Sequence, residues 1–237
     1  MRTNVDVGGD IKKTMKCIGF ITNNRAGLAG LFKELLPIFN RKALTVAFLR
    51  EGVSCPDTAP VPTGDLYPER LAISLPGNNS IASALAYLSA DIVLVDGFDY
   101  EKTFPRILLS RPDNFTDAQL DELLVTSTFV DRSLSSLPHA LTPAELADMI
   151  SEKAFSLPGL DCGHCGCATC YEFAREIIRG NRKPEECVSL KPLVRIRFGN
   201  FEMPMNPFIS GIIEKTIRGM LSALKGYRSG TVDIMIP

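Results

Sequence analysis

The sequence predicts an α/β protein in which a parallel-sheet domain precedes a small cysteine-rich module and a C-terminal β-hairpin–helix–strand unit. Apolar segments alternate with helical periodicity in the first half, four cysteines cluster after it, and turn signals separate the last apolar segments. We expect five parts: an N-terminal arm, an α/β domain, a connecting helix, the cysteine-rich module and the terminal unit (1–14, 15–130, 131–155, 156–190 and 191–237).

The α/β domain is predicted from strands and helices that alternate along the chain. Residues 15–22 form a short apolar strand, 27–39 have helical spacing, and 44–49 form a second apolar strand. This order indicates a βαβ unit and a parallel sheet. Pro37 is expected to end or kink the helix. The other expected elements are a loop at 50–70, a helix at 79–90, and strands at 71–75, 91–95, 106–110 and 123–129.

The second half carries clear helix-start signals. Thr142, Pro143 and Glu145 combine an N-cap, a proline at the first helical position and the glutamate of a capping box, which predicts a helix to about residue 155. After the cysteines we expect a hairpin at 193–203, a helix capped by Asn206 that runs to about Lys225, and a final strand at 232–236.

The cysteine-rich module has the spacing C-x2-C-x4-C-x16-C, formed by Cys162, Cys165, Cys170 and Cys187. Thiolates are the usual ligands of iron–sulfur clusters. Gly163 and Gly166 permit the positive φ angles and the close approach of backbone that a loop around a compact cluster needs, and their N–H groups are expected to point at sulfur. An amphipathic helix should follow Cys170. The pattern predicts a closed [4Fe-4S] site.

Other interpretations of the cysteines remain open. A zinc site more often has two C-x2-C pairs, and a disulfide framework needs an oxidising compartment, of which the sequence gives no sign. Cys167, inside the x4 gap, is expected to be a small non-ligating residue or a spare ligand. His164 should lie over the cluster or face solvent, His139 is expected to be a surface or packing residue, and Cys55 a bystander.

The segment CGHCGCATCYEFAREIIRG, with the later Cys187, resembles a known module. It is similar to the four-cysteine iron–sulfur module of corrinoid iron–sulfur proteins and of the B subunit of the Rnf electron-transport complex. The resemblance covers residues 156–190 and includes the cysteine spacing, the glycines and the Phe-Ala pair. It implies a low-potential [4Fe-4S] cluster.

A phosphate-binding loop, G-x4-G-K-[ST], would lie in the turn after the first strand. Thr22 occupies its first glycine position, Gly27 is retained, and Leu28 and Ala29 replace the lysine and the hydroxyl residue. Those two side chains hold the phosphates and Mg²⁺, so their loss makes GTP a doubtful ligand and predicts no GTP hydrolysis. A helix N-terminus remains an anion site in principle.

The segments IGFITNN…GLAGLFKELLPIF, ALTVAFLREG and ADIVLVDGFDYEKTFPRILLSR resemble molybdopterin-guanine dinucleotide biosynthesis protein B (MobB). This resemblance spans residues 15–126 and implies a P-loop-like fold. It makes Gly27 and Asp96 the positions of a vestigial nucleotide site, with Gly97 completing the family's acidic-Gly element. Arg106 stands where the family has lysine. Residues 50–70 lack the histidines that the family has after its second strand.

Composition narrows the class of protein. A net charge of −1 does not indicate the basic surface that nucleic-acid binding requires. No apolar run approaches the ~18 residues of a membrane span. The polar first fifteen residues and the clustered cysteines predict a cytoplasmic protein.

The two resemblances imply an iron–sulfur accessory protein that assists the maturation or insertion of a molybdenum or tungsten cofactor. The alternative is a [4Fe-4S] electron-transfer subunit or adaptor of an anaerobic redox complex. Both functions imply protein partners. No convergent set of catalytic side chains indicates independent hydrolysis.

Overall fold

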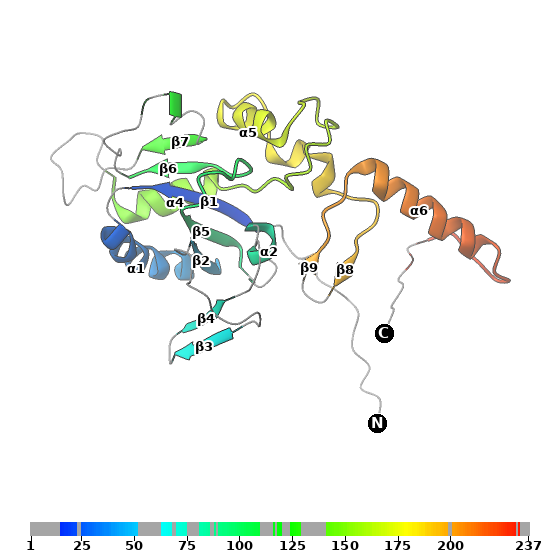
Figure 1. Cartoon of the computed structure of the whole chain (residues 1–237), viewed down its shortest axis with the longest axis horizontal. Coiled ribbons are helices and arrows are strands. Elements are labelled where there is room, and N and C mark those ends of the chain that lie inside the picture. Colours follow the sequence, from blue (N-terminus) through cyan, green and yellow to red (C-terminus); the bar gives the residue numbers. More distant parts are fainter. Residues whose placement is uncertain are drawn as a thin grey trace.

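A computed structural model describes residues 15–22, 25–51, 63–67, 70–74, 81–85, 88, 90–109, 116, 118–119, 124–128, 141–198, 201–230 and 232. The N-terminal arm, Cys55, His139 and all of the expected last strand except Val232 lie outside these ranges. Figure 1 shows a central sheet flanked by helices, with the α5 region beside it and the long helix α6 projecting away from it.

The central sheet confirms the predicted parallel α/β architecture. Its strand order is β2-β5-β1-β6-β7, and every pair is parallel. Because β5 pairs with both β1 and β2, Phe20, Arg50 and Asp96 lie in register at the carboxyl ends of three neighbouring strands. The bounds are β1 (Lys16–Ile21), β2 (Val46–Arg50), β5 (Ile92–Asp96), β6 (Arg106–Leu108) and β7 (Val125–Thr128).

Alternate side chains of β5 enter two separate cores, as expected for a strand covered on both faces. Ile92 and Leu94 pack with α1 (Arg25–Arg41) and α4 (Pro143–Lys153). Val93 and Val95 pack on the opposite face with Ile81 of α2 (Ile81–Leu85). The sheet therefore forms the middle layer of three.

The prediction was that Pro37 ends or kinks its helix, and helix α1 continues four residues beyond it, so the first of these two effects does not occur. Pro37 and Lys33 are both exposed. Water can therefore satisfy the Lys33 carbonyl, which has lost its usual N–H donor. Leu35 and Phe39, both fully buried, extend the apolar face across the proline.

The prediction that residues 50–70 form a loop is also wrong in part. β3 (Thr63–Tyr67) pairs antiparallel with β4 (Arg70–Ser74), in the register Thr63↔Ser74 to Tyr67↔Arg70. The segment TGDLY has weak strand character by itself. Pairing with the more apolar β4 supplies the stabilisation that the local sequence lacks.

Helix α4 begins as predicted with a complete capping box. Thr142 accepts a hydrogen bond from the backbone of Glu145, whose carboxylate accepts one from the Thr142 backbone. The helix was expected only to connect two parts, but Leu146, Ala147 and Ile150 are fully buried in the core that α1 covers. Helix α4 therefore packs on the central sheet beside α1 and forms part of the core of the α/β domain.

The remaining elements are α5 (Cys170–Ile178), the 3-10 helices η1 (Pro184–Glu186) and η2 (Val188–Leu190), β8 (Arg197–Phe198), β9 (Phe201–Glu202) and α6 (Pro207–Ser222). β8 pairs antiparallel with β9 in the register Arg197↔Glu202 and Phe198↔Phe201, within the segment where a hairpin was expected. Asn206 caps α6 by accepting a hydrogen bond from the Ile209 backbone at 2.9 Å, and the helix ends three residues earlier than expected. Among the described residues, no helix is both long and apolar enough to cross a bilayer.

Arg106 is fully buried beside the carboxyl end of β5. Its Nη2 donates hydrogen bonds to the carbonyl oxygens of Phe98 (2.6 Å) and Glu101 (2.9 Å), and its guanidinium lies over the Phe104 ring, 4.8 Å from the centroid. Gly19 leaves room for its stem, because an added Cβ would lie 2.8 Å from Arg106 Cγ. Burial lowers the pKa of the guanidinium to about 10.

We predict that Arg106→Met lowers the free energy of unfolding by about 3 kcal/mol, because two carbonyl groups lose a charged donor. Urea unfolding followed by circular dichroism measures this loss. Arg106→Lys retains a cation and should lose less. An unchanged midpoint in the methionine variant would contradict the prediction.

Candidate metal centre

The loop between α4 and α5 turns tightly at its glycines. Gly163 and Gly166 have φ angles of +70° and +82°, which confirms the need for residues without a Cβ. The Gly166 N–H donates to the Gly163 carbonyl oxygen at 3.0 Å. The expectation that this N–H points at sulfur is therefore wrong, because the turn already uses it.

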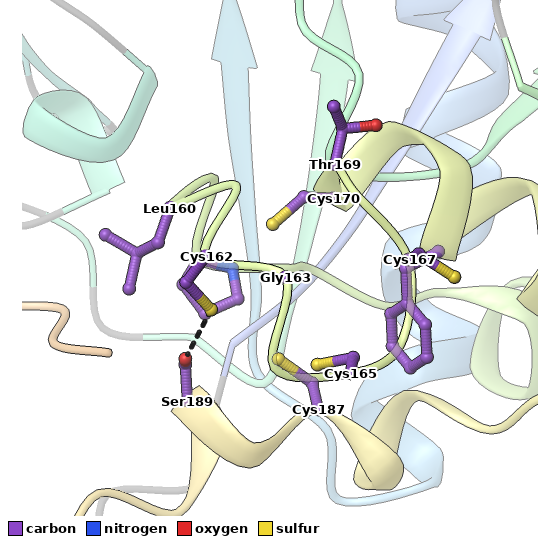
Figure 2. A pocket seen from close by; sticks show the side chains of 11 residues that line it. Leu160, Cys162, Gly163, Cys165, Cys167, Thr169, Cys170, Cys187 and Ser189 are labelled. Atoms are coloured by element: carbon purple, nitrogen blue, oxygen red, sulfur yellow. Dashed lines mark hydrogen bonds between the residues drawn. The ribbon is translucent and has the colours of Figure 1, made fainter. Parts of the chain in front are cut away.

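Five cysteines line one small hollow, together with Leu160, Phe173 and Ser189 (Figure 2). Its cavity volume is only about 10 Å³, so the side chains nearly fill the hollow. Figure 2 shows four sulfur atoms directed toward a common space, whereas the Cys167 sulfur points away from the other four. The four are those of Cys162, Cys165, Cys170 and Cys187.

Helix α5 holds Cys170 at its first turn. Thr169 is the N-cap and accepts a hydrogen bond from the Glu172 backbone at 3.1 Å. The Cys170 N–H donates to Asp161 Oδ1 at 2.6 Å, which joins the start of the helix to the start of the loop. Phe173 and Ala174 are buried, as the predicted apolar face requires.

Cys187 lies between η1 and η2 and is almost fully buried. Arg182 connects this segment to the glycine loop: its Nη2 donates to the Cys165 carbonyl at 3.0 Å and its Nε to Glu186 at 2.6 Å. Ser189 Oγ lies 3.5 Å from Cys162 Sγ. The ends of the module are thus held together by side chains from both sides of the hollow.

Asp161, Arg182 and Ser189 were not identified from the sequence. The Arg182–Glu186 pair at i,i+4 was readable as an ion pair, but nothing in the spacing relates it to Cys165. Asp161 precedes Cys162 and Ser189 follows Cys187 by two positions, but neither belongs to a sequence motif that would indicate a role. The sequence separation between the contacting residues explains why each was missed.

The thiols differ in their surroundings. Burial raises the pKa of Cys187 to about 11, and it also raises the pKa of Cys170. A metal bound to these residues must displace their protons, because the thiolate is the ligand form. His164 is exposed, and its Nδ1 lies 2.9 Å from the Cys162 carbonyl oxygen. This exposed position agrees with the expectation that His164 faces solvent.

The donor set fits an iron–sulfur cluster. Four cysteine thiolates hold both [2Fe-2S] and [4Fe-4S] clusters, and in either case they surround the cluster. Within the described ranges, no three His, Cys, Asp or Glu side chains converge closely enough to share one metal ion. The described cysteines are all free thiols.

The vestigial nucleotide site has a different character. Leu28, at the position of the P-loop lysine, is 1% exposed and packs in the core with Phe20 and Phe32, whereas Gly27 and Ala29 are exposed. A side chain at position 28 therefore points into the protein interior. It does not reach the surface where phosphates would bind.

Asp96 occupies the position of a Mg²⁺-directing carboxylate at the end of β5. It is 2% exposed, and its Oδ2 accepts a hydrogen bond from Arg50 Nε at 2.9 Å. In the turn after Asp96, the Phe98 N–H donates a hydrogen bond to Glu51 Oε2 at 2.7 Å. The Glu51 side chain lies so close to this turn that a Cβ on Gly97 would be 2.6 Å from its carboxylate. These residues do not fit a magnesium nucleotide.

Cys17 lies outside the cysteine-rich module, fully buried in β1. Burial raises its pKa to about 12, and a hydrogen bond with Ser156 offsets part of this effect. In the unfolded chain the pKa of this thiol is about 9.0, so the unfolded state loses its proton first and the stability of the fold falls as the pH rises from about 9 to about 12.

We predict that Cys17 resists iodoacetamide at about pH 8 until the chain is denatured. Cys17→Ala should show a smaller loss of stability than the parent protein between about pH 9 and pH 12. Peptide mapping after alkylation and urea unfolding across that range measure the two effects. Rapid alkylation of native Cys17 would contradict the burial.

Residues 157–189 match the family described as "FeS: Putative Fe-S cluster". A Methanopyrus kandleri protein, acetyl-CoA decarbonylase/synthase complex subunit gamma, is 50% identical over 34 residues, which are 14% of this chain and 7% of that protein.

Two further proteins are similar to a larger share of the chain. A Methanocaldococcus jannaschii protein named "Putative molybdopterin-guanine dinucleotide biosynthesis adapter protein" is 25% identical over 229 residues, covering 90% of this chain and 93% of its own. The crystal structure of a MobB homologue from Bacillus stearothermophilus is 18% identical, covers 58% of this chain and 94% of its own, and has a TM-score of 0.38. The chain is thus similar to a MobB-related adapter protein over most of its length, and residues 157–189 match the iron–sulfur family model.

Proposed function

We propose that this chain is an iron–sulfur accessory protein that assists the maturation or insertion of a molybdenum or tungsten cofactor. The observation that carries the cluster assignment is that four thiols from a loop, a helix start and a 3-10 junction face one hollow. The name of the M. jannaschii relative supports the link to molybdopterin chemistry.

The proposed ligands of a [4Fe-4S] cluster are Cys162, Cys165, Cys170 and Cys187. Such a cluster supplies reversible one-electron transfer when bound. Phe173 and Leu160 keep water from the inner side of the hollow, and the Ser189 hydroxyl is placed to donate to the Cys162 sulfur. Arg182 holds the two cysteine-bearing segments in position.

The α/β domain is proposed to act as a docking platform without GTP hydrolysis. Leu28 is part of the core and Asp96 is paired with Arg50, so phosphate and metal would lack their usual partners. In this proposal the domain retains the fold of a nucleotide-binding domain. The side chains at the phosphate and metal positions instead pack in the core or form an ion pair.

A second function, an electron-transfer subunit or adaptor, is favoured by the surface position of the glycine loop. Gly163, His164 and Gly166 are exposed, so the hollow lies just below the surface. A redox partner docked there would approach the sulfur atoms closely. The M. kandleri complex subunit is 50% identical over a short segment of 34 residues, which are 14% of this chain.

Anaerobic affinity purification of the full chain from its native cell tests the two functions. Recovery of a molybdopterin-synthesis enzyme, or of a cofactor-free molybdenum or tungsten enzyme, supports maturation. Stoichiometric recovery of a fully loaded redox enzyme overturns maturation in favour of electron transfer. A Cys187→Ser variant is the matched control for partners that require the assembled cluster.

Iron, sulfide and zinc analysis with Mössbauer spectroscopy tests the cluster separately. We expect about four irons and four sulfides per chain for a [4Fe-4S] cluster. One zinc per chain with no sulfide would overturn the assignment.

A further inference from the structure

Ser189 is a buried serine beside the proposed cluster site. It is 6% exposed and belongs to η2, two positions after Cys187. Its hydroxyl oxygen lies 3.5 Å from Cys162 Sγ, although 27 positions separate the two residues in the chain. Figure 2 shows this contact as a dashed line between the two side chains. The serine therefore reaches from the turn after one proposed ligand to the sulfur of another.

Apart from the sulfur atoms, the lining of the hollow contains few polar side chains. Among the described residues that form it, none has a charged side chain. Thr169 supplies the other hydroxyl, whose oxygen accepts the Glu172 N–H as the cap of α5. Leu160 and Phe173 supply apolar surface. A hydrogen bond in surroundings of low dielectric constant is electrostatically stronger than one in water, so the Ser189 hydroxyl acts on the sulfur with little screening.

Backbone hydrogen bonds hold the serine in place. The Leu190 N–H donates to the Cys187 carbonyl oxygen at 3.1 Å, and the Lys191 N–H donates to the Val188 carbonyl oxygen at 3.2 Å. These bonds close the 3-10 turn that carries Ser189. Because Cys187 directly precedes η2 and is almost fully buried, the same turn positions a proposed ligand and the hydroxyl group.

Metal binding decides the direction of this hydrogen bond. While Cys162 is a protonated thiol, either atom can be the donor. The ligand form of cysteine is the thiolate, which has no proton to donate. The Ser189 hydroxyl is then the donor. An iron–sulfur cluster gains one negative charge on reduction, so a hydrogen bond to a ligand sulfur stabilises the reduced form more than the oxidised form. Such hydrogen bonds are among the factors that set cluster potentials.

We propose that Ser189 raises the reduction potential of the cluster by donating its hydroxyl hydrogen to the Cys162 sulfur. The inference rests on the proposed [4Fe-4S] site. It deepens that proposal, because it assigns the adjustment of the cluster potential to a residue outside the ligand set. Ser189 acts through Cys162 and does not bind iron itself.

Redox titration of the anaerobically purified full chain, followed by electron paramagnetic resonance of the reduced cluster, tests the proposal. Ser189→Ala removes the hydroxyl and should keep its full iron content. We expect the equilibrium constant for reduction to fall about threefold to tenfold, the net effect of losing one hydrogen bond. For a one-electron couple this corresponds to a potential about 30 to 60 mV more negative. Ser189→Thr retains a hydroxyl, and its potential should lie closer to that of the parent protein.

Ser210→Ala is the matched control. Ser210 is also buried, but its Oγ accepts the Val194 N–H at 3.0 Å, and it does not line the hollow. Its cluster potential should equal that of the parent. An unchanged potential in Ser189→Ala with full iron content would overturn this proposal and leave the cluster assignment intact. Loss of iron from Ser189→Ala would also overturn it, because the serine would then serve assembly. A parent protein without an iron–sulfur cluster would overturn both the proposed function and this inference.

Discussion

Replacing any one of the four inward-facing cysteines by serine should remove the broad visible absorbance and most of the iron from the anaerobically purified protein. The four are Cys162, Cys165, Cys170 and Cys187. Their sulfur atoms surround the same hollow, so loss of one leaves a cluster iron without its thiolate. Visible absorbance and iron analysis per chain measure the effect, and we expect most of the iron to be lost with a ligand.

Cys167→Ser is the matched control, because it changes a cysteine in the same loop whose sulfur points away from the other four. Its iron content should equal that of the parent protein. Loss of colour in Cys167→Ser, or its retention in Cys170→Ser, would show that the ligand set is different from the one proposed. Circular dichroism identifies variants that fail to fold.

Restoring the P-loop lysine by Leu28→Lys should destabilise the protein and create no GTP site. Leu28 is 1% exposed in the core formed with Phe20 and Phe32, so the new ammonium group would be buried without a partner. We expect a loss of about 3 kcal/mol or more in the free energy of unfolding, comparable with truncating a core leucine and increased by desolvation of the charge.

Urea unfolding and equilibrium dialysis with Mg²⁺–GTP measure the two consequences. Ala29→Ser, at an exposed position of the same turn, restores the hydroxyl residue and should leave stability within about 0.5 kcal/mol of the parent. A stable Leu28→Lys protein that binds Mg²⁺–GTP would show that the turn can still adopt a phosphate-binding arrangement.

Local patterns in the sequence determined a large part of the structure. The alternation of apolar segments predicted the parallel sheet, and Thr142, Glu145 and Asn206 marked helix starts that the structure confirms. These signals succeed because capping and periodicity act between residues a few positions apart. The same is true of Gly163 and Gly166, whose positive φ angles follow from the tightness of a loop that carries closely spaced cysteines.

Only the tertiary structure decided which side chains meet. Arg50 pairs with Asp96 because β2 and β5 are neighbours in the sheet, although 46 positions separate them in the chain. The burial of Leu28 and the pairing of β3 with β4 likewise depend on long-range packing. The cysteine spacing alone indicated a cluster, but the direction of the Cys167 sulfur depends on how the loop and α5 fold around the hollow. Sequence patterns record contacts within a helix turn or a strand, whereas contacts between distant segments arise from the packing of the whole chain.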